Sequence, residues 1–287
     1  MKISACLVVH NDENTLKRCL DSIKKVVDEI IVVHDGPCSD SSLEIVAKYT
    51  DNVFVGEHIG EAEPHRNFGF KQAKGDWILQ IDSDEYLVPE MQKGLKKYLK
   101  ETKHSSVGAL WAPFQLSRKK GFWSRAGKSF LWKKSKMKHF SGTPHAIPQL
   151  SGTEGVMDLR FGHSAGFRRF SDKIYPWTTI QAAYLKAFDD PTSRTLGLGF
   201  LKLVVGVPIS YLRKGILDEG WRGVCFLFFQ WFYHFQIFLY LFFDAFGLRT
   251  RAYGDKKRQL IKFREKTVYK KVGGGEVVFR AGEMRDY

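Results

Sequence analysis

The alternation of apolar runs with helical patterns over residues 2–81 most constrains the fold of this chain. Four short apolar runs predict buried strands, and they are ISACLVV, EIIVV, NVFV and WILQI. The segments between them carry apolar residues at helical spacing, and they are NTLKRCLDSIKKVV, SDSSLEIVAKY and PHRNFGFKQAKG. We expect Ser39 or Asp40 to cap the second of these helices, Pro64 to open the third and Gly75 to close it. This order is typical of βα units, and it predicts an α/β fold with a mostly parallel, Rossmann-like sheet flanked by helices.

Acidic loops follow three of the predicted strands, and they read HNDE, HDGPCSD and DSDE. Because ligands of such sheets bind at the carboxyl ends of the strands, we expect the three loops to lie at one edge. Carboxylates this close raise each other's pKa unless a cation is near. Asp82 and Asp84 are one residue apart, so they share a face and suit Mg²⁺ or Mn²⁺. Capping of the following helices, or an ordinary turn at Gly36, is the alternative explanation.

Three segments together resemble the N-terminal half of family 2 glycosyltransferases: ACLVVHNDENTLKRCLDSI, DEIIVVHDGPCSDSSLEIV and RNFGFKQAKGDWILQIDSDEYL. The resemblance implies a GT-A fold that binds a nucleotide-sugar donor across the strand ends and a divalent metal (Mg²⁺ or Mn²⁺) on its diphosphate. His10 and His34 stand where relatives more often have Tyr and Asp. The implied roles are nucleoside contacts for Asn11, Glu13, Asp35 and Asp40, a phosphate contact for Arg66, and metal ligation by Asp82 and Asp84.

The middle of the chain resembles the lipopolysaccharide-core branch of that family, in the segment GTPHAIPQLSGTEGVMDLRFGHSAGFRRFSDKI. That resemblance implies that His145 and His163 face the site, with His163 at the metal or the diphosphate. Inverting sugar transfer needs a base for the acceptor hydroxyl. Relatives often carry Glu where this chain has Ala146, so the base is open among Asp158, Glu154 and His145, with Asp158 ranked first.

An uncharged apolar stretch of aromatic character, VCFLFFQWFYHFQIFLYLFF, occupies residues 224–243. Its length suits a membrane-spanning helix. At helical spacing, however, its polar side chains and Asp244 fall on one side, which favours an amphipathic helix that lies in the membrane interface or packs on the protein. We expect the shorter stretch at residues 203–212 to be interrupted by Pro208. Basic residues nearby favour peripheral attachment to the inner, anionic face of the cytoplasmic membrane.

The formal net charge of +14 suits an anionic partner. Residues 117–140 carry nine Lys or Arg residues interleaved with aromatic rings, and they suit an anionic glycan or glycolipid acceptor or a solvated loop. We predict a nucleotide-sugar-binding half at residues 1–115, an acceptor-side half at 116–195, and a helical, apolar membrane-associating extension with a basic tail at 196–287. The predicted function is inverting, metal-dependent transfer of a sugar to a lipopolysaccharide-core or lipid-linked cell-envelope glycan.

Two alternatives belong to other functional classes. A non-catalytic relative would keep donor binding without transfer, and Ala146 keeps this alternative open. A nucleic-acid-binding protein would use the basic segment, but the acidic loops would repel phosphates, so we expect no nucleic acid partner. The sequence holds neither GxGxxG nor GxxxxGK[ST], which argues against dinucleotide oxidoreductases and P-loop NTPases.

Overall fold

A computed structural model describes residues 1–111, 127–140, 148–163, 167–188, 190–213 and 215–279. The chain divides into two compact units. Among the described residues, the first unit contains those up to 111, those between 127 and 163, and 265–279, and the second contains those between 167 and 264. The last strands of the chain therefore belong to the same unit as the first.

A ten-stranded sheet forms the centre of the first unit, in the order β12-β11-β3-β2-β1-β4-β7-β6-β10-β5. The central block β3-β2-β1-β4 is parallel, as the sequence predicted, and β11 and β7 flank it in antiparallel orientation. A separate small sheet pairs β8 (Met137–His139) with β9 (Gln149–Leu150). The ten strands are β1 (Ile3–Val9), β2 (Glu29–Asp35), β3 (Val53–Gly56), β4 (Trp77–Gln80), β5 (Glu85–Leu87), β6 (Ser106–Trp111), β7 (Gly127–Lys133), β10 (Glu154–His163), β11 (Thr267–Lys271) and β12 (Glu276–Phe279).

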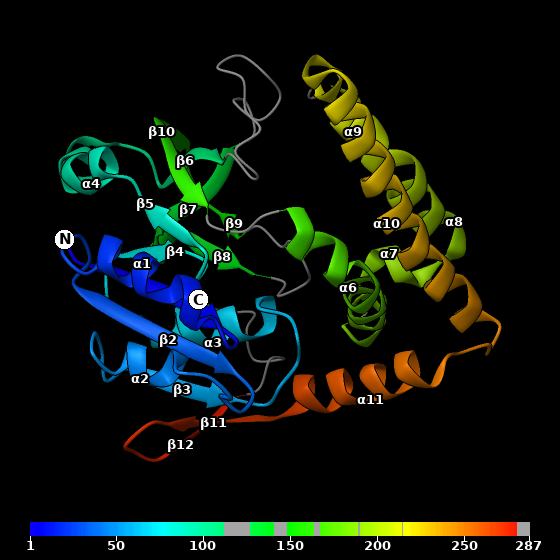
Figure 1. The fold of residues 1–287 in the computed structure, drawn as a ribbon, viewed down its shortest axis with the longest axis horizontal. Coiled ribbons are helices and arrows are strands. Elements are labelled where there is room, and N and C mark those ends of the chain that lie inside the picture. The colour runs from blue at the N-terminus through cyan, green and yellow to red at the C-terminus, as the bar shows by residue number, and fades with distance from the viewer. Residues whose placement is uncertain (112–126, 141–147, 164–166, 189, 214, 280–287) are drawn as a thin grey trace. The chain divides into compact units, whose positions relative to one another are not determined.

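Helices cover both faces of the parallel block (Figure 1). On one face, α1 (Glu13–Ile23), α2 (Ser42–Val46) and α4 (Pro89–Glu101) pack onto alternate residues of the strands and close the main apolar core. On the other face lies α3 (Glu63–Gln72), where the thiol of Cys6 in β1 donates a hydrogen bond to the carbonyl of Gly69. The apolar spacing read from the sequence thus places the helices correctly.

Two predicted helix boundaries are off by one to three residues. Ser41, rather than Ser39 or Asp40, occupies the cap position of α2, and the Asp40 carboxylate accepts a hydrogen bond from the backbone N–H of Ser42. Pro64 lies in the first turn of α3 as predicted, but the helix ends at Gln72 instead of Gly75 because Ala73 adopts an extended backbone conformation. Local residue types therefore predict roughly where a helix ends, but not the exact terminal residue.

The second unit is helical in its described part. Its helices are α6 (Phe167–Ala187), α7 (Pro191–Arg194), α8 (Leu196–Gly199), α9 (Val207–Arg213), α10 (Trp221–Ala245) and α11 (Arg251–Glu265), with a π-helical segment at Phe200–Gly206 and a 3₁₀ turn at Ile216–Glu219. The prediction that Pro208 interrupts the stretch before α10 is wrong. The backbone N–H of Val207 bonds to the carbonyl of Lys202, and this wider π spacing lets the helical path continue past a residue that has no N–H to donate.

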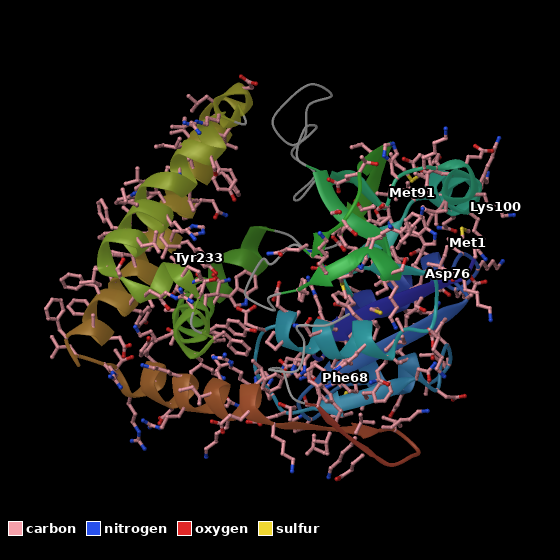
Figure 2. All side chains as sticks on the ribbon, turned by 180° about the vertical axis from the view of Figure 1, so that it is seen from behind. Met1, Phe68, Asp76, Met91, Lys100 and Tyr233 are labelled. Atoms are coloured by element: carbon pink, nitrogen blue, oxygen red, sulfur yellow. The ribbon has the colours of Figure 1, made fainter. Side chains whose placement is uncertain are left out.

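The polar side of α10 faces its own unit. Tyr233 is 4% exposed and Asp244 is 5% exposed, whereas Phe228 is 60% exposed; Figure 2 labels Tyr233 on this helix. Tyr240 accepts a hydrogen bond from the hydroxyl of Thr179 in α6. The amphipathic pattern predicted from the sequence is therefore present, with its aromatic side directed away from the unit's interior. Residues 196–213 and 223–245 are both long and apolar enough to cross a membrane by length and composition.

Candidate functional site

The loops after β1 and β2 are joined to each other by their own polar side chains. The side-chain oxygen of Asn11 accepts a hydrogen bond from the backbone N–H of Ser39 (2.8 Å), and the Glu13 carboxylate accepts one from Ser41 (3.0 Å). In return, the backbone N–H of Glu13 donates to the carboxylate of Asp40 (3.0 Å). Asn11 has a φ of 51°, a left-handed conformation that Asn tolerates better than most residues. The structure thus brings together three of the four residues assigned to the nucleoside, Asn11, Glu13 and Asp40, and each of them also holds the two loops together.

The third acidic loop joins the same edge of the sheet. The hydroxyl of Ser83 donates a hydrogen bond to the Asp12 carboxylate (2.7 Å), which ties the segment after β4 to the loop after β1. Glu85 is 1% exposed, and its carboxylate accepts a hydrogen bond from the backbone N–H of Asp82 (2.9 Å). The prediction that the three loops converge is confirmed. Glu85 supports the turn and begins β5, whereas Asp82 and Asp84 remain half-buried.

Arg66 lies beside the DSD segment. Its guanidinium forms an ion pair with the Asp82 carboxylate at 2.6 Å and a longer one with Glu63 at 3.7 Å. Next to this pair, burial and then the charge of Glu63 raise the pKa of Glu61 well above its ordinary value. Arg66, which was assigned to the phosphates, therefore contacts Asp82, which was assigned to the metal. Arg66 belongs to α3, which follows β3, whereas Asp82 follows β4.

The donor set of the DSD segment fits a hard divalent cation. Asp82 and Asp84 supply carboxylate oxygens two residues apart, and the Asp82 side chain is 37% exposed. Mg²⁺ and Mn²⁺ prefer such oxygen ligands and keep further positions for water or phosphate. If both carboxylates were fully buried, water or phosphate could not reach the metal. The partial exposure of Asp82 and Asp84 therefore suits Mg²⁺ or Mn²⁺.

Asp35 is a buried acid at this edge. Its carboxylate accepts hydrogen bonds from the backbone N–H groups of Ile59 (2.5 Å) and Gly60 (2.8 Å), from His58 Nδ1 (3.1 Å) and from His65 Nε2 (2.9 Å). Burial acts to raise the pKa of Asp35, but the hydrogen bonds from the two histidines and from Ile59 outweigh it, and the pKa lies far below its ordinary value. Asp35 is therefore an ionised, buried carboxylate.

Tyr269, in β11, extends the hydrogen-bond network of Asp35 through His65. His65 Nδ1 lies 3.0 Å from the hydroxyl of Tyr269 in β11, and both side chains are fully buried. The ring of Tyr269 stacks on Phe68 of α3 with centroids 3.7 Å apart. A Cβ added at Gly56 would lie 2.7 Å from the Tyr269 ring and 2.9 Å from His65, so glycine is required there for this packing.

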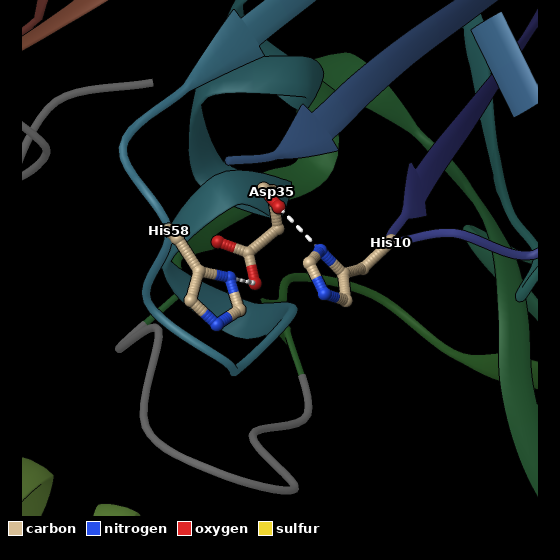
Figure 3. Close-up of side chains that lie close together, drawn as sticks. All are labelled: His10, Asp35 and His58. Atoms are coloured by element: carbon tan, nitrogen blue, oxygen red, sulfur yellow. Dashed lines mark hydrogen bonds and ion pairs between the residues drawn. The ribbon is translucent and has the colours of Figure 1, made fainter. Parts of the chain in front are cut away.

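Two more histidines lie at these strand ends: His10 follows β1 and His34 is in β2, and Figure 3 draws His10 together with Asp35 and His58. His10 Nδ1 lies 2.5 Å from the backbone carbonyl of Asp35, and the rings of His10 and His58 stack with centroids 4.5 Å apart. His34 Nδ1 lies 2.6 Å from the carbonyl of Gly36. Sequence reasoning singled out neither His58 nor His65. His58 could have been found from the sequence, because it follows β3 by two residues and therefore lies at the same strand ends as the acidic loops.

The residues considered for the base are spread along the acceptor side. Glu154 and His163 stand at opposite ends of the ten-residue strand β10, roughly 30 Å apart along an extended strand. The backbone of His163 pairs with Glu85, next to the DSD segment, so the structure brings His163 to this edge and leaves Glu154 far from it. Asp158 lies in β10 where the pairing register with β6 shifts, between Met157 and Arg160. His145 and Ala146 lie outside the described residues.

Comparison with known proteins places this site in a family. Residues 4–174, more than half of the chain, match the family described as glycosyl transferase family 2. An uncharacterized glycosyltransferase of Rickettsia felis is 35% identical over 91 residues, which are 32% of this chain and 31% of that protein. Poly(ribitol-phosphate) beta-glucosyltransferase of Bacillus spizizenii is 39% identical over 101 residues, which are 31% of this chain and 16% of that protein.

The matched region thus spans about a third or less of the length of these relatives. Among solved structures, TarS 1-349 of S. aureus in complex with UDP aligns with a TM-score of 0.43 and 18% identity, over 86% of this chain and 92% of that chain. The family match covers every strand of the parallel block and all three acidic loops. The chain belongs to glycosyl transferase family 2 and has the GT-A fold of that family.

Proposed function

We propose that this chain is an inverting, metal-dependent glycosyltransferase that moves a sugar from a nucleotide sugar to a lipopolysaccharide-core or lipid-linked cell-envelope glycan. One observation carries the proposal. The acids after β1, β2 and β4 converge at a single edge of the sheet, with Arg66 against Asp82. Family membership gives that arrangement its chemistry.

The donor side follows from the charges at this edge. Asp82 and Asp84 would hold Mg²⁺ or Mn²⁺, which when bound neutralises charge on the diphosphate leaving group. Arg66 places a fixed positive charge at the same point, 2.6 Å from Asp82. Asn11 and Asp35 lie further along the strand ends, where the nucleoside would bind.

The metal assignment is tested by nucleoside diphosphate release. A panel of nucleotide sugars is supplied with Mg²⁺ or Mn²⁺ and a membrane-lipid extract as acceptor. Asp84→Asn should lower release roughly a hundredfold or more, because charge stabilisation of the leaving group is lost. Asp51→Asn, at an exposed site before β3, is the matched control and should keep full release. Unchanged release in Asp84→Asn would contradict the metal site, and no release by wild type with any donor would contradict the transfer reaction.

For the base we propose Asp158. It belongs to the strand that ends beside the DSD segment, and irregular strand positions recur next to active sites. Asp158→Asn should lower kcat by roughly 10²–10⁴-fold with donor affinity kept, as loss of a general base does. Glu154→Gln, at the far end of the same strand, serves as the control and should be neutral. The opposite result, with Glu154→Gln inactive and Asp158→Asn active, would exclude Asp158.

We also propose that the protein attaches peripherally to the inner face of the cytoplasmic membrane. The supporting observation is that α10 directs its polar side into its own unit while Trp221, Phe228 and Phe232 stay exposed on its aromatic side. Exposed apolar surface of this extent on a helix suits a lipid interface. The anionic acceptor and the lipid-linked glycan of the proposed reaction would be met there.

Fractionation of cells tests the attachment. Wild type should stay with membranes in high salt and leave them in detergent, because apolar insertion resists salt. The double variant Phe228→Ser/Phe232→Ser should move to the soluble fraction. Val268→Ser/Val278→Ser, which changes two exposed apolar residues on β11 and β12, is the control and should stay with membranes. Wild type found only in the soluble fraction would refute the proposal.

A further inference from the structure

Three potential metal ligands gather outside the DSD segment, at the ends of β1, β2 and β3. They are His10, Asp35 and His58, and one ligand atom of each lies within 4.8 Å of the others. They come from three separate strand ends, so the fold, and not a local sequence motif, brings them together. We propose that His10, Asp35 and His58 form a second cation site, specific for Zn²⁺ or a cation of similar softness and separate from the site at Asp82 and Asp84.

The donor chemistry separates the two sites. Two imidazoles and one carboxylate are a common ligand set for zinc and its transition-metal neighbours, whereas Mg²⁺ and Mn²⁺ prefer the all-oxygen set of the DSD segment. Three protein ligands also leave a fourth tetrahedral position for water or an added ligand. The same sheet edge would therefore sort cations by softness.

The geometry of Asp35 and His58 is close to that of a bound pair. His58 Nδ1 and Asp35 Oδ2 are 3.1 Å apart. Two ligands of a tetrahedral zinc with bonds of about 2.0–2.1 Å are separated by roughly 3.3 Å. A cation could therefore replace the shared hydrogen between His58 Nδ1 and Asp35 Oδ2 with only a small movement of these two atoms. The other donors to Asp35, the N–H groups of Ile59 and Gly60 and the ring of His65, can keep their hydrogen bonds.

The ring of His10 is already held in a suitable tautomer. Its Nδ1 lies 2.5 Å from the carbonyl of Asp35, and since a carbonyl only accepts, this nitrogen carries the hydrogen. The lone pair of a neutral His10 is then on Nε2, where it accepts a long hydrogen bond from the side-chain amide of Asn11 (3.4 Å), and a cation bound there would replace that contact. In Figure 3 this second nitrogen lies on the side of the ring toward His58 and the Asp35 carboxylate. Ring nitrogens fixed by backbone carbonyls are the usual support of metal-binding histidines.

The carboxylate of Asp35, the third ligand, is also held by hydrogen bonds. His65 Nε2 donates to Asp35 Oδ1, and His65 Nδ1 is held in turn by the Tyr269 hydroxyl. Both supporting side chains are fully buried, so the carboxylate has a fixed orientation. His58 is 49% exposed in its side chain and stacks on His10, so it can adjust by side-chain rotation when a cation enters.

Binding of the metal alone tests this site. The 287-residue chain, stripped of metal by a chelator, is titrated with Zn²⁺ by calorimetry in excess Mg²⁺, which keeps the DSD segment supplied with a hard cation. We expect one Zn²⁺ per chain, and His58→Ala should weaken binding roughly tenfold or more. Co²⁺ in place of Zn²⁺ should show the intense visible absorption of a four-coordinate site, and this absorption should be lost in His58→Ala.

Two control variants separate this site from other sources of binding. His104→Ala removes an imidazole that pairs with Thr153 elsewhere in the same unit, and Asp84→Asn changes the DSD segment; both should bind Zn²⁺ like wild type. Unweakened binding in His58→Ala, or loss of binding in Asp84→Asn, would overturn the proposal. Thermal melting of each variant shows whether it is folded. Because no readout uses sugar transfer, failure here is distinct from failure of the proposed function.

Discussion

Two kinds of aspartate stand at one edge of the sheet, and their surroundings divide their tasks. Asp35 is 3% exposed and accepts four hydrogen bonds, two of them from backbone N–H groups of the loop after β3. Asp82 is partly exposed and forms an ion pair with Arg66. A buried carboxylate with fixed donors organises the chain around it, whereas a partly exposed one keeps positions for an exchangeable ligand.

The charge of Asp35 should make stability depend on pH. Its folded pKa is depressed, and an unfolded aspartate has a pKa of about 3.9, so the stabilisation is complete above that value and is lost as the pH falls below it. Asp35→Asn should lower the free energy of unfolding by about 2–4 kcal/mol at neutral pH, and by less at a pH near 3. Urea unfolding at the two pH values measures both. Asp51→Asn is the control, and an equal loss for Asp35→Asn at both pH values would contradict the assignment.

At the scale of elements, the strands β11 and β12 belong to the first unit although they are the last strands in the described part of the chain. β11 pairs antiparallel with β3, and its Tyr269 inserts between α3 and the network of Asp35. The hydroxyl contributes a hydrogen bond to His65, and the ring contributes packing against Phe68. The two contributions can be separated by substitution.

Tyr269→Phe keeps the ring and removes the hydroxyl, so we expect a loss of about 1–2 kcal/mol in the free energy of unfolding. Tyr269→Ala also opens a cavity and should cost about 3–5 kcal/mol. Denaturant unfolding measures the two losses. If Tyr269→Phe were as damaging as Tyr269→Ala, the hydrogen bond rather than the packing would dominate, contrary to this expectation.

How far the sequence determines these elements depends on the range of the interactions. The parallel strands, α1 and the convergence of the acidic loops follow from local patterns, and the structure confirms them. The contact of His65 with Tyr269 joins residues 204 positions apart, so no local pattern could indicate it. The π-helical segment before Pro208 depends on backbone bonding that residue types alone do not specify.

On the scale of the whole molecule, the proposed membrane attachment has two physical sources, the excess positive charge and the exposed aromatic side of α10. The formal net charge is +14, and Arg249, Arg251 and Arg258 lie near the end of α10 or in α11. Each basic residue near an anionic membrane contributes about 1 kcal/mol, and salt screens that contribution while leaving apolar insertion in place.

Vesicle binding should therefore show two components. Purified protein should sediment with anionic phospholipid vesicles more strongly than with neutral ones, by roughly tenfold or more in affinity at low salt. Higher salt should remove most of that difference and leave a residual binding that Phe228→Ser/Phe232→Ser abolishes. Equal binding to both vesicle types at low salt would show that the charge has no part in attachment.

The pairing of β11 with β3 also determines when the sheet can be completed during synthesis of the chain. A ribosome releases β1 to β4 first, yet the edge of β3 stays open until β11 emerges, after the helical unit has been made. Open strand edges invite pairing with other chains, and contacts this distant in sequence form slowly. Premature termination before residue 267 would thus leave an open sheet edge and an Asp35 network without Tyr269, and newly made chains would depend on chaperones until their last strands arrive.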